Sequence, residues 1–170
     1  MLNFLFARLT PRHDDGTRAF AAVIAIARRP AFFRHGQVPD TIDGRFALLT
    51  TVLALLLNRI ELEGDRGNPL SVVLTERFIA AMEAEHRELG LGDPTLGKTV
   101  RKLVGALARR VDWWRSAIAD GGEWSAATRS SVYASEPDPA ALELVATELR
   151  ALWSRLVAAD LAALANGAIG

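Results

Sequence analysis

The sequence predicts an all-α protein, a single domain over 1–170 with about six or seven helices around a buried central helix at about 41–62. Apolar residues in every long segment recur at steps of three and four, the period of a helix with one buried face. Asparagine or aspartate precedes proline at 68–69, 93–94 and 138–139. Such a pair is typical of a first helical turn, because the side chain caps free amides and proline has none to satisfy.

Length and composition agree with one globular domain. Of the 170 residues, 50% are hydrophobic and 24% are charged, which is enough for a sizeable core. Twenty basic residues balance twenty acidic ones, so no net field attracts nucleic acid and we expect no nucleic-acid specificity. The absence of cysteine excludes disulfides, thiolate metal sites and cysteine nucleophiles.

The first two predicted helices are strongly apolar. Residues 17–29 contain several alanines among larger apolar residues, which favours a helix over a strand. Residues 46–57 are apolar almost all round, as expected of a helix in the centre of a soluble core. A helix beginning at 40 or 41 places Gly44 in its first turn, at a cost of ~1 kcal/mol relative to alanine. We therefore expect another stretch of backbone to approach Gly44 closely.

Three amphipathic helices are predicted to follow. The first begins at 68–69, and its apolar stripe is Leu70, Leu74, Phe78, Met82 and Leu89. The second begins at 93–94, with the stripe Leu96, Val100, Leu103, Leu107, Val111, Trp114 and Ile118. The third is an alanine-rich C-terminal helix over 139–165. Glycines at 64, 90 and 121–122 mark helix ends.

Charge is distributed unevenly along these helices. Residues 61–93 carry eight acidic and three basic side chains, whereas residues 95–118 carry six basic and one acidic. Lys98, Lys102 and Arg109 share one helical face. This face has two interpretations: a solvated surface that pairs with the acidic neighbouring helix, or a docking strip for an anionic partner.

The N-terminal stretch Met1–Arg8 is apolar but short, and it also has two interpretations. We favour a short helix packed on the core over a peripheral membrane contact. The longest charge-free apolar stretch, 46–58, is well short of the ~20 residues that a membrane-spanning helix needs. The order of charge and apolar residues at the start is the opposite of that in a signal peptide.

Residues 92–99 match the phosphate-loop pattern of Gly, four residues and Gly-Lys-Thr. That loop lies between a buried strand and a helix, but the residues before Gly92 are charged and helical. The Asp-Pro pair inside the pattern predicts a helix start, which places Gly97 and Lys98 in a helix. Nucleotide binding is therefore a minor alternative.

Other motifs give little support for catalysis. Glu83 and His86 form a single Glu-x-x-His pair, whereas carboxylate-bridged di-iron bundles use two. The histidines are scattered, and no serine lies in a nucleophile elbow. We predict no enzyme activity, no catalytic residue, no metal and no cofactor. Trp114 continues the apolar stripe and is predicted to be core, whereas Trp113 lies off it and is a candidate contact residue.

Two separated segments resemble the hallmark sequences of the ubiquinol–cytochrome c chaperone family. They read Gly36-Gln37-Val38-Pro39-Asp40-Thr41-Ile42-Asp43-Gly44-Arg45-Phe46 and, after Met82, Arg87-Glu88-Leu89-Gly90-Leu91-Gly92-Asp93 with Gly97, Lys98, Val100 and Lys102. The resemblance spans about 17–120 and accounts for the apparent phosphate loop, since the family motif supplies its glycines and lysine. The chain departs from the family at Ala108-Arg109-Arg110, where an aromatic-Gly-Arg is usual, and at Thr50-Thr51, where a histidine is usual.

The resemblance implies a chaperone that assists assembly of the cytochrome bc1 complex. Its implied client is newly made cytochrome b or another bc1 subunit, and family members act near the ribosome with a small partner protein. The composition, rich in alanine, arginine and leucine, favours a bacterial form. For such a form the resemblance implies a place in the cytoplasm, peripheral at the inner membrane. A helical interaction protein for another membrane client is the alternative.

We predict that the client-binding surface forms around two corners of the chain, 40–45 and 87–102, and not at the alanine-rich end. The predicted contact residues are Asp43, Arg45, Arg87, Glu88, Asp93, Lys98, Lys102 and Trp113. Glycines beside these charges permit close backbone approach. A competing interpretation is structural: Arg45 or Arg87 pairs with Glu88 or Asp93 and braces the corner.

Overall fold

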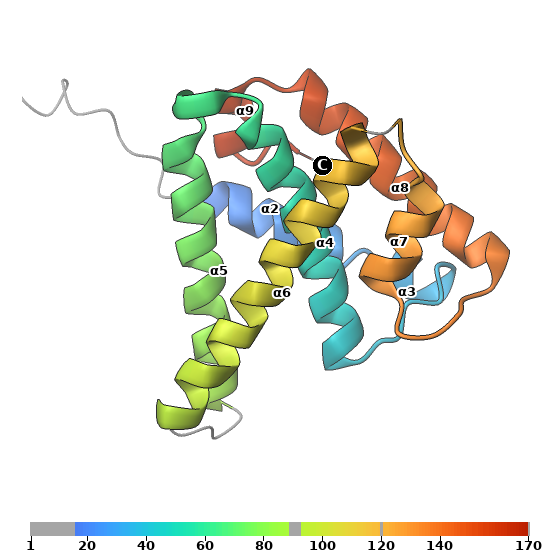
Figure 1. The fold of residues 1–170 in the computed structure, drawn as a ribbon, viewed down its shortest axis with the longest axis horizontal. Helices are drawn as coiled ribbons and strands as arrows, with labels where there is room; N and C mark the ends of the chain where they lie inside the picture. Colours follow the sequence, from blue (N-terminus) through green and yellow to red (C-terminus); the bar gives the residue numbers. More distant parts are fainter. Residues whose placement is uncertain (1–15, 89–92, 120, 170) are drawn as a thin grey trace, which may run out of the picture.

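The computed structural model describes residues 16–88, 93–119 and 121–169, and all regular elements within them are helices (Figure 1). The predicted all-α class is thus confirmed. The helices are α2 (Thr17–Ala27), α3 (Pro30–Arg34), α4 (Ile42–Glu61), α5 (Asn68–Glu88), α6 (Asp93–Ala119), α7 (Trp124–Val132), α8 (Pro139–Ala158) and α9 (Leu161–Ala165), with a 3₁₀ turn at Gly64–Arg66. The N-terminal stretch 1–8 lies outside the described residues.

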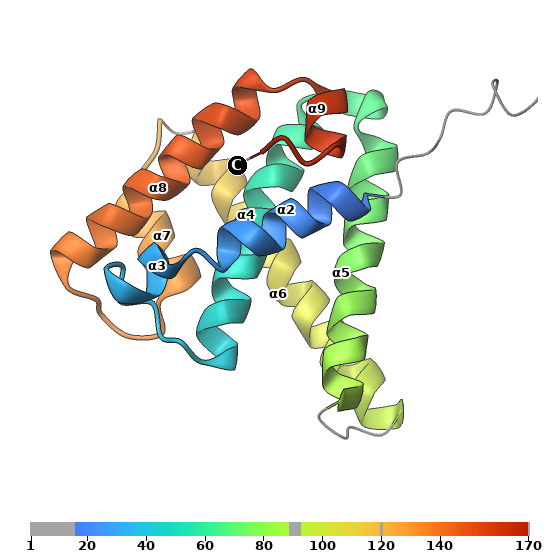
Figure 2. The ribbon, with the colours of Figure 1, turned by 180° about the vertical axis from the view of Figure 1, so that it is seen from behind.

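Helix α4 is the buried central helix that its sequence predicts. Fourteen of its 20 residues are buried. It contacts α2, α5, α6, α7 and α8, and α2 and α6 cross its opposite sides (Figures 1 and 2). No helix in the described part of the chain is long and apolar enough to cross a bilayer.

The amphipathic stripes of α5 and α6 face this core. The buried residues of α5 are Leu70, Leu74, Phe78 and Met82. The buried residues of α6 are Leu96, Val100, Leu107 and Trp114. Trp114 is therefore core, as predicted, and Trp113 beside it is 53% exposed.

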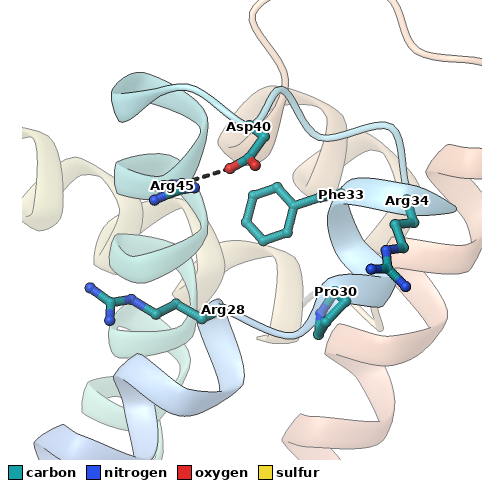
Figure 3. A pocket seen from close by; sticks show the side chains of 6 residues that line it. All are labelled: Arg28, Pro30, Phe33, Arg34, Asp40 and Arg45. Carbon is teal, nitrogen blue, oxygen red and sulfur yellow. Dashed lines mark hydrogen bonds and ion pairs between the residues drawn. The ribbon is translucent and has the colours of Figure 1, made fainter.

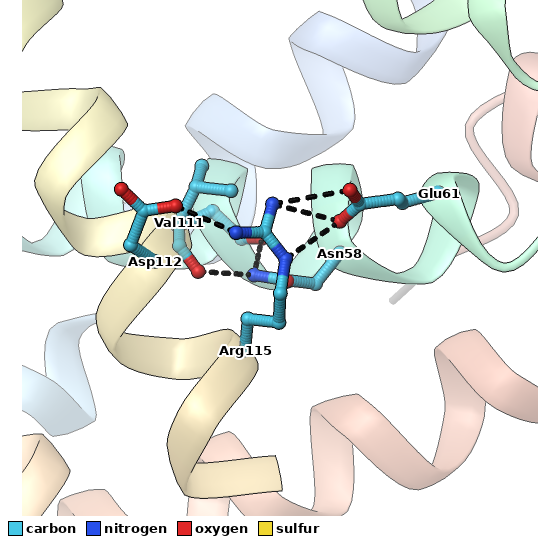
Figure 4. Close-up of polar contacts among 6 residues, drawn as sticks. Asn58, Glu61, Val111, Asp112 and Arg115 are labelled. Carbon is cyan, nitrogen blue, oxygen red and sulfur yellow. Dashed lines mark hydrogen bonds and ion pairs between the residues drawn. The ribbon is translucent and has the colours of Figure 1, made fainter. Parts of the chain in front are cut away.

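Polar contacts fix the second half of α6 on α4 (Figure 4). Asn58 Nδ2 donates to the Val111 carbonyl oxygen at 3.0 Å, so one buried amide joins the two helices. Arg115 donates through Nε and Nη2 to both carboxylate oxygens of Glu61 at 2.9–3.1 Å. Hydrogen bonds to Glu61 and Asp112 raise the pKa of Arg115 above its usual range. The register of α6 on α4 is thereby set from one end.

A buried arginine fixes the other side of α4 to the end of α8. Arg59 donates through Nε to the Leu156 carbonyl at 3.0 Å and through Nη2 to the Ala159 carbonyl at 2.9 Å. It also forms an ion pair with Glu63 at 2.9 Å. The last carbonyls of a helix lack amide partners within that helix. Here the Arg59 side chain of α4 donates to two carbonyls at the end of α8.

The prediction of one continuous helix over 139–165 is wrong. Helix α8 ends at Ala158, Ala159 is extended, and Asp160 caps α9 by accepting from the Ala163 amide at 2.7 Å. The alanine-rich composition does not predict this break, because alanine favours a helix on both sides of it. The contact of Arg59 with the Ala159 carbonyl comes from a residue 100 positions away.

Candidate functional site

Three hollows meet around the N-terminal end of α4, where the first predicted corner lies. The first, here called the apolar groove, is about 480 Å³ and lies between α2, α4, α5 and α6. Its apolar lining includes Phe20, Ile24, Phe46, Leu49, Met82 and Leu103, and its charged lining is Arg28, Asp43, Arg45, Glu85 and Glu88.

The other two hollows adjoin this groove. The basic hollow, about 580 Å³, lies between the start of α4, α6 and the end of α7, and includes Lys102, Arg109 and Arg110. It shares Asp43, Phe46 and Leu103 with the apolar groove. The arginine hollow, about 420 Å³, is lined by Arg28, Pro30, Phe33, Arg34, Asp40 and Arg45 (Figure 3). Shared lining residues place the three hollows side by side around the first turns of α4, and together they are here called the recessed surface.

The local sequence builds this corner in a way that requires glycine at position 44. Thr41 caps α4, its Oγ1 accepting from the Gly44 amide at 3.2 Å. A Cβ at position 44 would overlap the carbonyl oxygen of Pro39. The expected close backbone approach is confirmed: the segment before α4 folds against its first turn, and only glycine leaves room for it.

Phe46 forms the wall between the apolar groove and the basic hollow. Its ring lies 6.2 Å from that of Phe78, and the Arg110 guanidinium lies 5.8 Å from its centroid. Arg110 donates to the carbonyl oxygens of Ser131 and Ala106 at 3.0–3.3 Å. Burial lowers the pKa of Arg110 below its usual range, and these contacts make it a brace of the wall.

The basic face of α6 is exposed, and its cations do not pair with α5. Lys98, Lys102 and Arg109 are all exposed and make no ion pair with any described side chain. Lys102 and Arg109 line the basic hollow, whereas Lys98 lines none of the three hollows. At 100° per residue, Trp113 lies within about 60° of each of these three cations, on the same face of α6. It does not line the basic hollow. The interpretation of this face as one paired with its acidic neighbour is not supported in the described residues.

Among the described side chains, the two arginines at the corners pair with acidic residues of their own segments. Arg45 pairs with Asp40 at 2.6 Å, and Arg87 pairs with Glu83 at 3.8 Å. The hydrogen bond from Arg45 holds the pKa of Asp40 below its usual range. Both arginine side chains are 60% exposed, so each pair contributes little to stability. Glu88 is not used by either arginine, and the side chain of Asp93 lies outside the described part.

Four of the predicted contact residues line the recessed surface. Asp43, Arg45 and Glu88 line the apolar groove, and Asp43 and Lys102 line the basic hollow. Arg87, Lys98 and Trp113 do not line these hollows. Sequence analysis missed Ile42, which is 61% exposed at the groove, and the end of α7, which closes the basic hollow. The signal that could have indicated Ile42 is the position of an isoleucine directly after the Thr41 cap, outside the apolar stripe of α4.

The end of α7 is held against the corner by Tyr133. Its hydroxyl donates to the Gly36 carbonyl at 2.5 Å, which ties residues far apart in sequence. Burial raises the pKa of Tyr133 to about 12, so it keeps this proton at neutral pH. No signal in the local sequence indicates this contact.

The apparent phosphate loop does not form a loop. Residues 93–99 belong to α6, so the amides of Gly97, Lys98 and Thr99 are part of a helix and do not surround a shared anion site. No strand precedes them in the residues that the structure describes. Nor do the described residues contain a cluster of metal-ligating side chains. The His86 ring instead contacts the Met82 carbonyl through Nδ1 at 2.8 Å.

The described residues thus form an all-helical domain with an open apolar groove rimmed by charged side chains. The sequence profile of the ubiquinol-cytochrome C chaperone family matches residues 34–169. This chain therefore belongs to the ubiquinol–cytochrome c chaperone family, which confirms the resemblance found in its sequence.

A solved structure gives the same result. The crystal structure of the Cbp3 homolog from Brucella abortus is similar over 100% of this chain and 96% of that chain, with 27% sequence identity and a TM-score of 0.81. A comparison with curated proteins found no match. The family and this fold assign the protein the role of a ubiquinol–cytochrome c chaperone.

Proposed function

We propose that the protein binds newly made cytochrome b on the recessed surface around the start of α4 and holds it during assembly of the bc1 complex. It would do so in the cytoplasm, peripheral at the inner membrane. The observation that carries the proposal is the apolar groove: its lining comes from four helices, and beside it lie cations of α6 that make no ion pair with any side chain the structure describes.

The chemistry of this surface suits an unassembled membrane subunit. Such a subunit exposes apolar side chains that need temporary cover, and the groove offers the partly exposed Ile24, Phe46 and Leu49 to them. The groove is also preorganised. Thr41 caps the first turn of α4 and Gly44 packs against the Pro39 carbonyl, so this edge of the groove needs little ordering on binding. Apolar contacts alone would not fix the orientation of a bound client, and the charged side chains at the rim of the groove restrict that orientation.

Ile42 gives the sharpest test of the groove, because it is a large apolar side chain exposed at its edge. We expect Ile42→Lys to weaken cytochrome b capture by more than about fivefold, as truncation of a contact residue worth over 1 kcal/mol does. The free energy of unfolding of the Ile42→Lys variant should stay within about 0.5 kcal/mol of wild type, since the side chain is already exposed. Crosslinking and pull-down from native membranes, scored for cytochrome b, measures the capture.

The matched control is Leu62→Lys at the opposite end of α4. Leu62 is 68% exposed and lies away from the three hollows, so Leu62→Lys makes the same kind of substitution outside the proposed site. It should leave capture at the wild-type level. Equal capture by both variants would remove the groove from the proposal, and recovery of a different membrane protein in place of cytochrome b would select the alternative client.

The basic hollow is tested by charge reversal on α6. We expect Lys102→Glu to weaken capture about two- to fivefold, with a steeper loss at low salt, because Lys102 lines the hollow without an ion pair in the described residues. Arg101→Glu, an exposed neighbour that lines none of the three hollows, is the control. Lys98→Glu should have a smaller effect than Lys102→Glu. Normal capture and normal bc1 assembly in both lysine variants would show that the client does not contact this face.

A further inference from the structure

The arginine hollow and the apolar groove are joined by two side chains. Arg28, at the end of α2, and Arg45, in the first turn of α4, line both of them. Figure 3 shows these two arginines on one side of the Phe33 ring, with Arg34 on the other. A ligand lying in the groove therefore meets cations at the end where the two hollows join.

The arginines in this hollow are unequally engaged. Arg45 already holds a carboxylate, since its Nε donates to Asp40 Oδ1 at 2.6 Å. Arg28 and Arg34 are exposed and make no ion pair within the described part of the chain. The arginine hollow thus has three guanidinium groups and one carboxylate, an excess of two positive charges. The apolar groove adds the carboxylates of Asp43, Glu85 and Glu88, so the excess of positive charge is confined to the end of the groove where the two hollows join.

We infer that the arginine hollow and the apolar groove act as one site that selects client segments in which an acidic side chain adjoins apolar residues. The inference rests on the proposed function, because it specifies what the groove accepts. Planar guanidinium groups bind carboxylates through paired N–H donors, as Arg45 already does with Asp40. The acidic side chain would contact Arg28, which lines both hollows, with Arg34 adding positive charge from the far side of the Phe33 ring, and the adjoining apolar residues would cover the groove.

Asp40 has a specific part in this arrangement. It is an internal carboxylate that occupies Arg45 and limits the positive charge offered to a ligand. Both partners of the pair are about 60% exposed, so removing the Asp40 charge is compatible with an intact fold. Asp40→Asn should therefore increase affinity for an acidic segment, an effect opposite to that of ordinary damage to a binding site.

The test uses two synthetic peptides of leucine and alanine that end in either paired aspartates or paired asparagines, with binding followed by fluorescence anisotropy. We expect wild-type protein to prefer the aspartate peptide about two- to fivefold. The preference should rise by a similar factor in Asp40→Asn and disappear in the double variant Arg28→Gln, Arg34→Gln. Arg129→Gln, an exposed α7 arginine that lines none of the three hollows, should leave it unchanged.

Equal binding of the two peptides by wild-type protein, or the same preference in all variants, would overturn the inference. The proposed function has a separate readout, the capture of cytochrome b by wild-type and Ile42→Lys protein. Loss of capture in Ile42→Lys without any aspartate preference would retain the function and reject the selectivity. An aspartate preference that follows the arginines, with capture indifferent to Ile42, would retain the selectivity and reject the proposed function.

Discussion

Trp114→Ala should lower the free energy of unfolding by about 3–5 kcal/mol, the range for removal of a large aromatic side chain from a core. Trp114 is fully buried, and its ring lies 5.2 Å from that of Trp124. Its Nε1 donates to Ser131 Oγ at 3.2 Å, and Ser131 Oγ lies 2.6 Å from Thr51 Oγ1. The substitution therefore leaves both a cavity and a weakened polar link between α4, α6 and α7. Urea unfolding followed by circular dichroism measures the loss.

Trp113→Ala is the matched control, because it removes the same side chain from the adjacent position. Trp113 is 53% exposed, so the change should stay within about 0.5 kcal/mol of wild type. Similar losses at the two positions would contradict the orientation of α6 described here. Trp114→Phe should lie between the two, because it keeps most of the apolar volume but loses the hydrogen bond to Ser131.

Gly44→Ala should cost about 3 kcal/mol, near the upper end of what a forced methyl group costs in a packed site. The obstacle is the backbone carbonyl of Pro39, which cannot move aside as a flexible side chain would. Relief requires the segment before α4 to shift. Because that segment borders the basic and arginine hollows, the variant should also lose cytochrome b capture at temperatures where it remains folded.

Gly97→Ala should raise the free energy of unfolding, whereas Gly44→Ala lowers it. Gly97 lies inside α6, and an added Cβ would meet only the far end of Arg101 at 3.9 Å. Alanine is favoured over glycine in a helix interior by about 0.8–1 kcal/mol, so thermal unfolding should shift upward. A loss of stability at position 97, or none at position 44, would contradict the packing assigned to these two glycines.

The candidate site was only partly accessible from the sequence. The resemblance and the odd position of Gly44 located the corner at 40–45, and the structure places Asp43 and Arg45 in its hollows. The pairing of Arg45 was not predictable in this way. Long exposed side chains pair with whichever opposite charge the local backbone brings within reach, and here that charge is Asp40, five residues earlier in the chain.

Some features of this protein follow from the sequence alone. The helical class, the buried central helix and the start of α8 after Asp138 depend on apolar period and on capping groups within a few residues. These interactions join residues only a few positions apart, so the local sequence is enough to predict them. The core position of Trp114 follows from the same period.

Other features were decided only by the tertiary structure. The break between α8 and α9 involves Arg59, and the basic hollow is closed by Tyr133, whose hydroxyl reaches Gly36. The apolar groove exists because four helices, α2, α4, α5 and α6, come together around partly exposed apolar side chains. Each of these features joins residues separated by many tens of positions, and the spacing of residues along one segment carries no information about which distant segment will face it.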